Sequence, residues 1–255
     1  MRTAYVGVSQ DAKLGGPTFT FTDHKIYTSA AGSLGATNGL NQIFPAMAVD
    51  NFGYVYSLWS DQSNIFFSSS TNLGTTWTTP IRVNQGTTVG KANVFPWIAA
   101  DANGHVVISW IGANLAGNSN DATIMEQTCS DGTSSCWAQW SVYVAESVNG
   151  HASASKFTQS TASDHVVHYG TVSTGGLGGS ANRNLGDFYQ LALDTQHRAN
   201  ISFADNHLAS PLCTTQSTGH CANNDPASFR VATPYFTYQL KANPTIATTG
   251  KCAGS

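Results

Sequence analysis

The sequence contains little charge. Only 10% of its 255 residues are Asp, Glu, Lys or Arg, and the formal net charge is −3 at pH 7. No basic stripe is available for the phosphates of a nucleic acid, and no apolar run reaches the roughly 18 residues of a membrane-spanning helix. We therefore expect neither a nucleic-acid partner nor a membrane span. Few charges together with abundant Gly, Ser, Thr and Asn favour an extracellular or cell-surface location.

Sustained apolar spacing at i, i+3, i+4 and i+7 is also missing, so no helix is predicted. What the chain has instead is an internal repeat. Residues 44–59 and 95–110 align without a gap, and a weaker third copy starts at Phe188. In each copy a turn separates two alternating apolar runs, which is typical of a β-hairpin. Repetition at about 40–50 residues indicates a solenoid, a propeller or another array.

The turn of each hairpin has characteristic chemistry. Asp50 to Gly53 and Asp101 to Gly104 combine side chains that bond their own backbone with a glycine that accepts positive φ. Pro45 and Pro96 are expected where a strand begins, because proline donates no ladder hydrogen bond there.

Further strand-like runs follow each hairpin, so that about four strands fall in about 45 residues, the size of a propeller blade. We predict an all-β chain forming one β-propeller domain over residues 1–255, with about 3.5 four-stranded antiparallel blades. The blade-like units are 4–28, 44–83, 95–160 and 185–240. The first unit has only a third and a fourth strand, and no signal peptide precedes it. We expect either the C-terminal part of a longer propeller or self-association through open strand edges.

Five cysteines are present. Cys129 and Cys136 enclose one polar loop, and Cys213 and Cys221 enclose another. Both pairs are predicted to form local disulfides, with free thiols as the alternative, and Cys252 is left over. Zinc is not expected, because the chain has no Cys-x-x-Cys or His-x-x-x-His spacing.

One octapeptide resembles a known family motif. Residues 70–77 read Ser-Thr-Asn-Leu-Gly-Thr-Thr-Trp. They resemble the Asp box, Ser-x-Asp-x-Gly-x-Thr-Trp, of the sialidase or BNR-repeat propellers, whose complete rings have six blades. Distorted copies begin at Ser9 and Ser147. The resemblance implies a structural turn away from the catalytic face, formed by Ser70, Asn72, Gly74, Thr76 and Trp77.

A second segment resembles secreted bacterial sialidase-like propellers. It comprises His168-Tyr169-Gly170-Thr171, a Gly/Ser-rich loop, and residues 183–188, Arg-Asn-Leu-Gly-Asp-Phe. The resemblance covers about residues 4–240 and implies the sialidase-like fold.

Sialidase catalysis would need an arginine triad for the substrate carboxylate, a tyrosine nucleophile with a glutamate, and an aspartate as acid/base. The chain has five arginines and two glutamates, and the Phe-Arg-Ile-Pro motif of the family is absent. The triad is therefore not filled. The remaining weak catalytic candidates are Arg183, Asp187, Arg230, Tyr235 and Glu146. Tyr235 has core packing as its alternative, and Glu146 a place on a solvated strand.

A polar cluster is expected at the central channel of the predicted propeller, where strands of neighbouring blades begin or end. Arg183 and Asp187 precede the first strand of a blade, whereas Asp61 and Asp205 follow second strands, with His207 nearby. These five residues are the predicted ligand-binding group for a sugar or an anion. The alternative is an Arg–Asp pair that ties blades together.

No cofactor is expected. If a metal is bound, calcium would suit the oxygen-rich loop that carries Asp164, His165 and His168.

Together these features predict an extracellular sialidase-like Asp-box propeller without full sialidase catalysis. It would recognise a glycan or a cell-surface polymer, or build a surface assembly. The alternative is an exo-sialidase-like glycoside hydrolase.

Overall fold

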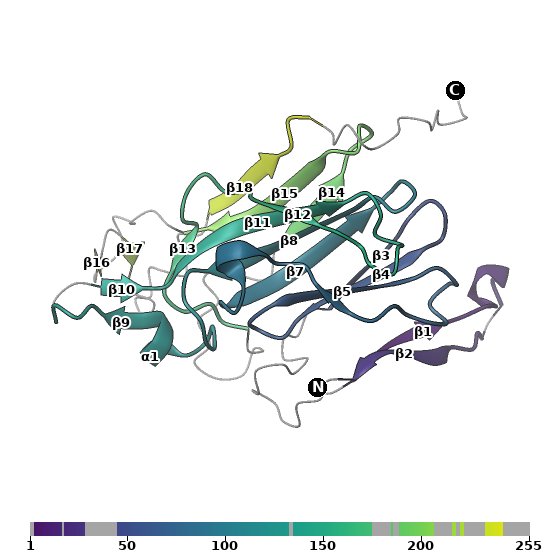
Figure 1. The fold of residues 1–255 in the computed structure, drawn as a ribbon, viewed down its shortest axis with the longest axis horizontal. Coiled ribbons are helices and arrows are strands. Elements are labelled where there is room, and N and C mark those ends of the chain that lie inside the picture. The colour runs from purple at the N-terminus through teal and green to yellow at the C-terminus, as the bar shows by residue number, and fades with distance from the viewer. Residues whose placement is uncertain are drawn as a thin grey trace.

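The computed structural model describes residues 3–16, 18–28, 45–132, 135–174, 185, 189–206, 216–217, 220–221 and 233–241 (Figure 1). Strands account for 47% of the chain and helices for 6%, which confirms the all-β class. All strand pairs are antiparallel, and no sheet among the described residues closes on itself.

The sheets follow one another in chain order. The first sheet pairs β1 (Thr3–Val8) with β2 (Thr22–Thr28). The second sheet has four strands in sequential order: β3 (Ala46–Val49), β4 (Val55–Ser60), β5 (Ile65–Ser70) and β6 (Ile81–Arg82). Tyr27 of the first sheet stacks on Trp59 of the second, with ring centroids 5.5 Å apart.

The third and fourth sheets repeat this meander. The third contains β7 (Asn93–Ala100), β8 (Val106–Ala113), β11 (Gln139–Ser147) and β12 (Thr158–Thr161), with β13 (His168–Tyr169) also paired to β11. The fourth contains β14 (Gln190–Leu193), β15 (Ala199–Asp205) and β18 (Thr233–Tyr238). Strand β16 (Gln216–Ser217) pairs antiparallel with β17 (His220–Cys221).

The predicted hairpin repeat is present as β3–β4, β7–β8 and β14–β15. The first strands of these hairpins pack against one another, since β7 contacts both β3 and β14. All of β8 is buried between the second and fourth sheets. This position explains why its sequence is apolar at nearly every position, with Ser109 as the exception, rather than alternating.

Two apolar clusters hold the sheets together. One joins the second and third sheets through side chains such as Tyr56, Phe67 and Trp110. The other joins the third and fourth sheets through side chains such as Trp140 and Phe203. Burying each such side chain contributes roughly 1.5–3 kcal/mol, so these clusters dominate the attraction between sheets.

Pro96 does not begin a strand as predicted. It lies inside β7, where the register shifts between Val94 and Trp97, and Phe95 before it has a φ of 51°. A bulge interrupts the ladder, so the missing proline N–H leaves no gap in the hydrogen bonding there. Pro45 directly precedes β3, as expected.

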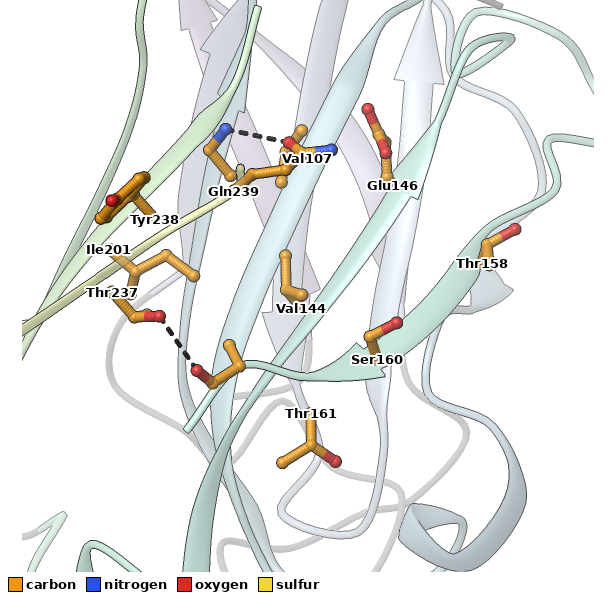
Figure 2. Close-up of a pocket in the computed structure, with 12 residues that line it drawn as sticks. Val107, Val144, Glu146, Thr158, Ser160, Thr161, Ile201, Thr237, Tyr238 and Gln239 are labelled. Carbon is orange, nitrogen blue, oxygen red and sulfur yellow. Dashed lines mark hydrogen bonds between the residues drawn. The ribbon is translucent and has the colours of Figure 1, made fainter. Parts of the chain in front are cut away.

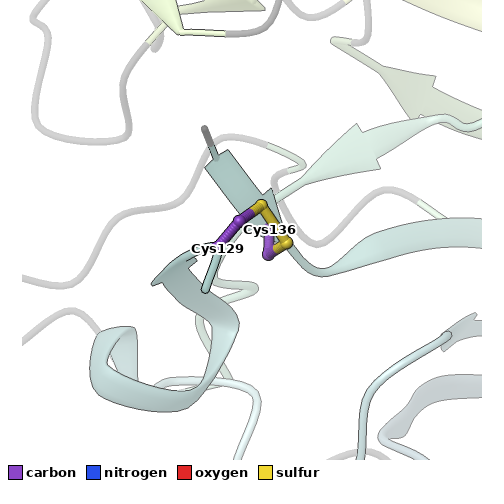
Figure 3. The surroundings of a disulfide bond; sticks show 2 residues. All are labelled: Cys129 and Cys136. Atoms are coloured by element: carbon purple, nitrogen blue, oxygen red, sulfur yellow. A yellow bond between two sulfur atoms is a disulfide. The ribbon is translucent and has the colours of Figure 1, made fainter. Parts of the chain in front are cut away.

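The segment between β8 and β11 is more structured than predicted. It contains a helix, α1 (Ala122–Met125), whose N-cap Asp121 accepts from Thr123 N, followed by the hairpin of β9 (Glu126–Thr128) and β10 (Ser135–Trp137). The predicted Cys129–Cys136 disulfide closes this hairpin, with a Cα–Cα distance of 4.9 Å (Figure 3). Two short 3-10 turns, η1 (Ala12–Leu14) and η2 (Gly86–Thr88), complete the helical content of the described residues.

Cys213 and Cys252 lie outside the described residues, so the second disulfide stays a prediction. None of the helices described is both long and apolar enough to span a membrane.

Candidate functional site

The octapeptide at 70–77 forms a hydrogen-bonded turn between the third and fourth strands of the second sheet. Asn72 Oδ1 accepts from Ser70 Oγ and from Thr76 N, each at 2.9 Å. Leu73 and Gly74 adopt φ values of 57° and 83°, and Trp77 Nε1 donates to Gly74 O at 2.9 Å. The asparagine oxygen thus makes the backbone contact that a carboxylate would make.

The two distorted copies form the same kind of turn. After β1, Asp11 Oδ1 accepts from Ser9 Oγ at 2.6 Å and from Thr20 N at 3.0 Å. After β11, Asn149 Oδ1 accepts from Ser147 Oγ at 2.9 Å and from Lys156 N at 3.2 Å. We call these three motifs the Ser-x-Asx turns. In each case the strand before the turn pairs with the strand that follows the turn: β1 with β2, β5 with β6, and β11 with β12.

The hairpin turns lie at the same end of the sheets as the Ser-x-Asx turns, because Val55 pairs with Ser70 and Val106 with Ser147. We call this the hairpin end. Each hairpin turn begins with an aspartate: Asp50, Asp101 or Asp194. Two of these carboxylates reach the next sheet. Asp50 Oδ2 accepts from Gly104 N at 3.1 Å, and Asp101 Oδ2 lies 2.6 Å from His197 Nδ1.

His105 is the centre of a charged network at the hairpin end. Only 1% of it is exposed, yet its Nδ1 lies 2.6 Å from Asp101 Oδ1 and its Nε2 lies 2.9 Å from Glu146 Oε1. Burial alone would lower the pKa of His105, but the two carboxylates outweigh burial and raise that pKa to about 9. His105 is therefore an imidazolium that donates one hydrogen bond to each carboxylate.

Asp101 carries the matching charge. Burial would raise its pKa, but hydrogen bonds from His105, His197 and the backbone lower the pKa to about 2. Asp101, His105 and His197 also offer ligand atoms within 4.8 Å of one another, a spacing that a metal ion could bridge. Such an ion would have to displace the His105 proton that already binds Asp101, so the geometry favours the hydrogen-bonded network.

A cavity of about 350 Å³ opens beside this network, between the third and fourth sheets (Figure 2). Its floor is apolar and includes Val107, Val144 and Ile201, whereas hydroxyl and amide groups surround it: Thr158, Ser160, Thr161, Thr237 and Gln239. Tyr238 lies on the β18 side, opposite Thr158 and Ser160 of β12, and Glu146 lies toward one end. We call this the inter-sheet pocket.

Two hydrogen bonds fix the shape of the inter-sheet pocket. Thr237 Oγ1 donates to Ala162 O at 3.1 Å, which ties β18 to the loop after β12. Ala199 N donates to the Gln239 side chain at 3.1 Å. The pocket is thus bounded by strands and by contacts between sheets.

The predicted ligand residues Asp61 and Asp205 lie at the opposite end of the sheets, after β4 and at the end of β15. Asp61 Oδ1 accepts from Ser63 N and Asn64 N at 2.9 and 2.7 Å. Its Oδ2 is buried and has no hydrogen-bond partner in the part of the chain that the structure describes. Burial raises the pKa of Asp61.

Asp205 belongs to a histidine-centred group instead. His165 lies between Asp164 Oδ1 and Asp205 Oδ2, at 2.5 Å from each, and packs edge-on against Tyr235. Burial would lower the pKa of His165, but the two carboxylates raise it. His168, expected in the same metal loop, contacts Asn206 Oδ1 and Thr171 O instead. The described contacts therefore divide the predicted metal residues between two separate groups.

The remaining candidates have mixed outcomes. Arg183, Asp187, His207 and Arg230 lie outside the described residues, so their predicted roles stay predictions. Glu146 does not take the solvated strand position that was the alternative to a catalytic role, because the register of β11 places it against His105. Tyr235 is 40% exposed rather than packed in the core.

Sequence reasoning missed the contacts of His105 and His197. His105 and His197 occupy turn positions of the hairpin repeat, four and three residues after its aspartate. Comparing side chains at equivalent turn positions could have found them.

The comparisons with known proteins do not assign the chain to a family. No protein-family model and no curated protein matches it.

Proposed function

We propose that this chain is a sialidase-like Asp-box β-propeller that recognises glycans outside the cell and lacks a complete sialidase machinery. The observation that carries this proposal is the set of three Ser-x-Asx turns. Each has the serine-to-Asx bond and a later backbone N–H that donates to the same Asx side chain, from Thr76, Thr20 or Lys156. Three such turns at equivalent strand connections support a repeated blade rather than an isolated motif.

The arrangement of the sheets supports the same proposal. Antiparallel meanders of three to five described strands follow one another along the chain, and the first strands β3, β7 and β14 pack side by side. In a propeller, the first strand of each blade lines the central channel. The disulfide and the low charge suit an extracellular setting.

Recognition is favoured over hydrolysis by the contacts of the charged residues. Arg198 forms an ion pair with Asp194 in its own hairpin turn, with Nη2 and Oδ2 2.8 Å apart, and Arg82 lies on the outer strand β6. Glu146 contacts His105 rather than a tyrosine. A triad would therefore have to come from Arg2, Arg183 and Arg230, which are the other arginines of the chain.

A glycan array and a fluorogenic sialoside together test this proposal. We expect binding to one or more glycans on the array and no release of the fluorophore above the level of buffer. Sialoside turnover that disappears in both Arg183→Ala and Asp187→Ala would replace recognition with the exo-sialidase alternative. No binding to any glycan would contradict the recognition role.

Self-association remains a second candidate, and it rests on a different observation. Strand β18 presents exposed aromatic side chains, with Phe236 and Tyr238 at 58% and 55% exposure and their rings stacked 5.9 Å apart. Exposed aromatics on an outer strand favour association with another chain. Light scattering across a concentration series tests this candidate: a particle of constant monomer mass would contradict it.

A further inference from the structure

We propose that the inter-sheet pocket binds a neutral pyranose, as a free sugar ring or as one residue of a glycan. This inference rests on the proposed glycan recognition and adds to it the place and the class of ligand. It assigns recognition to the space between the third and fourth sheets rather than to the predicted cluster around Arg183 and Asp187.

The pocket matches the two kinds of surface that a pyranose presents. The C–H face of the ring is apolar and can lie over the floor of Val107, Val144 and Ile201. The hydroxyl edge of the sugar would face Thr158 and the other hydroxyl groups around the pocket.

Glu146 supplies a strong acceptor at one end of the pocket. Its Oε1 binds His105 Nε2, which fixes the side chain. Among the described residues no hydrogen bond to its Oε2 is found. A carboxylate held in this way accepts hydrogen bonds from sugar hydroxyls that are shorter and stronger than those between neutral groups.

Charge decides the class of sugar. Among the residues that the structure describes, Glu146 is the only charged one that lines the pocket, and the His105 imidazolium behind it also bonds Asp101. A sugar that carries a carboxylate would bring a second negative charge next to Glu146, and such a juxtaposition of like charges is unfavourable. The pocket therefore favours neutral sugars over sialic acid.

Size is consistent with one or two sugar rings. The volume of about 350 Å³ is near the lower limit of small-molecule pockets, which range over roughly 300–1,000 Å³.

Saturation-transfer difference NMR on the full chain provides the test. The probes are the methyl glycosides of glucose, galactose and mannose, and the methyl α-glycoside of N-acetylneuraminic acid as the charged comparison. We expect at least one neutral glycoside to receive saturation, and the charged one to receive none.

Variants locate that signal. Thr158→Ala removes a hydroxyl group at the edge of the pocket and should weaken the binding of the neutral glycoside about three- to ten-fold, the range expected for loss of one hydrogen bond. Glu146→Gln keeps an oxygen for His105 and should also weaken that binding. Thr22→Ala is the matched control, because Thr22 is exposed on β2 and lines no part of the pocket.

Each outcome separates this inference from the proposed function. Neutral binding that weakens in Thr158→Ala and is kept in Thr22→Ala supports the pocket. Neutral binding unchanged in both Thr158→Ala and Glu146→Gln overturns the pocket but leaves glycan recognition intact. Binding of the sialic acid glycoside that depends on Thr158 overturns the neutral class. Absence of saturation transfer to every glycoside, together with no binding on the glycan array, overturns both proposals.

Discussion

Two neighbouring hairpin turns perform the same task with different chemistry. The Asp50 turn connects the second sheet to the third, and the Asp101 turn connects the third to the fourth. Asp50 Oδ2 accepts from the Tyr56 hydroxyl at 2.8 Å and from Gly104 N, which are uncharged donors. Asp101 instead bonds two histidine rings, His105 and His197. The repeat thus places the aspartate, and the neighbouring side chains decide how the contact responds to pH.

The donors to the two aspartates show which contact between sheets depends on a titrating proton. Burial and the bond to Asp50 raise the pKa of Tyr56, so its hydroxyl keeps its proton across the physiological range. The His105 ring loses its second N–H once its proton leaves near pH 9. We therefore expect the contacts of Asp50 to contribute equally to stability between pH 6 and pH 9, and the contacts of Asp101 to contribute less as the pH rises. The following substitutions test this difference.

Removing His105 should have the largest effect. His105→Leu fills a similar volume but leaves the carboxylates of Asp101 and Glu146 facing each other across an apolar side chain. Loss of one partner from a buried charged group costs about 3 kcal/mol or more. Urea unfolding followed by tryptophan fluorescence at pH 7 measures the change, and a loss below about 1 kcal/mol would mean that the network contributes little.

The pH dependence of wild-type stability should be the next largest effect. The pKa of His105 is about 9 in the folded protein against an ordinary value of 6.5. Because the folded value is the higher one, the contribution is complete below about pH 6.5 and is lost as the pH rises to about 9. The free energy of unfolding should fall over this window by up to about 3 kcal/mol.

A series of urea titrations from pH 6 to 9 tests this dependence. His105→Leu is the control and should flatten the slope over that window. At the acid end the sign reverses, because the pKa of Asp101 falls from 3.8 to about 2. Asp101 therefore contributes above pH 3.8 and loses that contribution as the pH falls toward 2. A wild-type slope that persists in His105→Leu would assign the pH dependence to other groups.

The contacts of Asp50 should respond less to the loss of a donor. Tyr56→Phe removes the hydroxyl that binds Asp50 Oδ2 and keeps the buried ring, while Gly104 N still binds that oxygen. We expect a loss of about 1.5–2 kcal/mol, the lower part of the range for a hydrogen bond to a charged group, because the second donor remains. The loss should be equal at pH 6 and pH 9, and a loss confined to one of these values would remove the contrast between the two aspartates.

The sequence predicted the features that short spacing encodes. Alternation and turn residues identified the hairpins at 44–59 and 95–110, the octapeptide identified the turn at 70–77, and the spacing of Cys129 and Cys136 identified their disulfide. Each of these depends on residues fewer than 20 positions apart. Local chemistry was sufficient because the partners of such features are determined within one hairpin or one turn.

The charged network and the pocket could not be predicted in this way. His105 meets Glu146 across 41 residues, and Asp101 meets His197 across 96. Both contacts depend on how β11 is registered against β8 and on how the fourth sheet packs on β7. The bulge at Pro96 and the exposure of Tyr235 likewise follow from tertiary packing. No spacing in the sequence specifies these distances.

The smallest effect is expected at His197, where two opposing terms meet. His197 has a φ of 61° at the turn position that Gly53 and Gly104 occupy with φ values of 81° and 75°. His197→Gly removes the bond to Asp101 but relieves a left-handed backbone that costs other residues roughly 1–2 kcal/mol, so stability should change by less than about 0.5 kcal/mol. His197→Ala loses the bond without that relief and should be about 1 kcal/mol less stable than the glycine variant in urea unfolding. If the glycine and alanine variants are equally stable, the left-handed backbone at position 197 costs no free energy. The Asp194 turn would then differ from the Asp50 and Asp101 turns only in the side chain at this position.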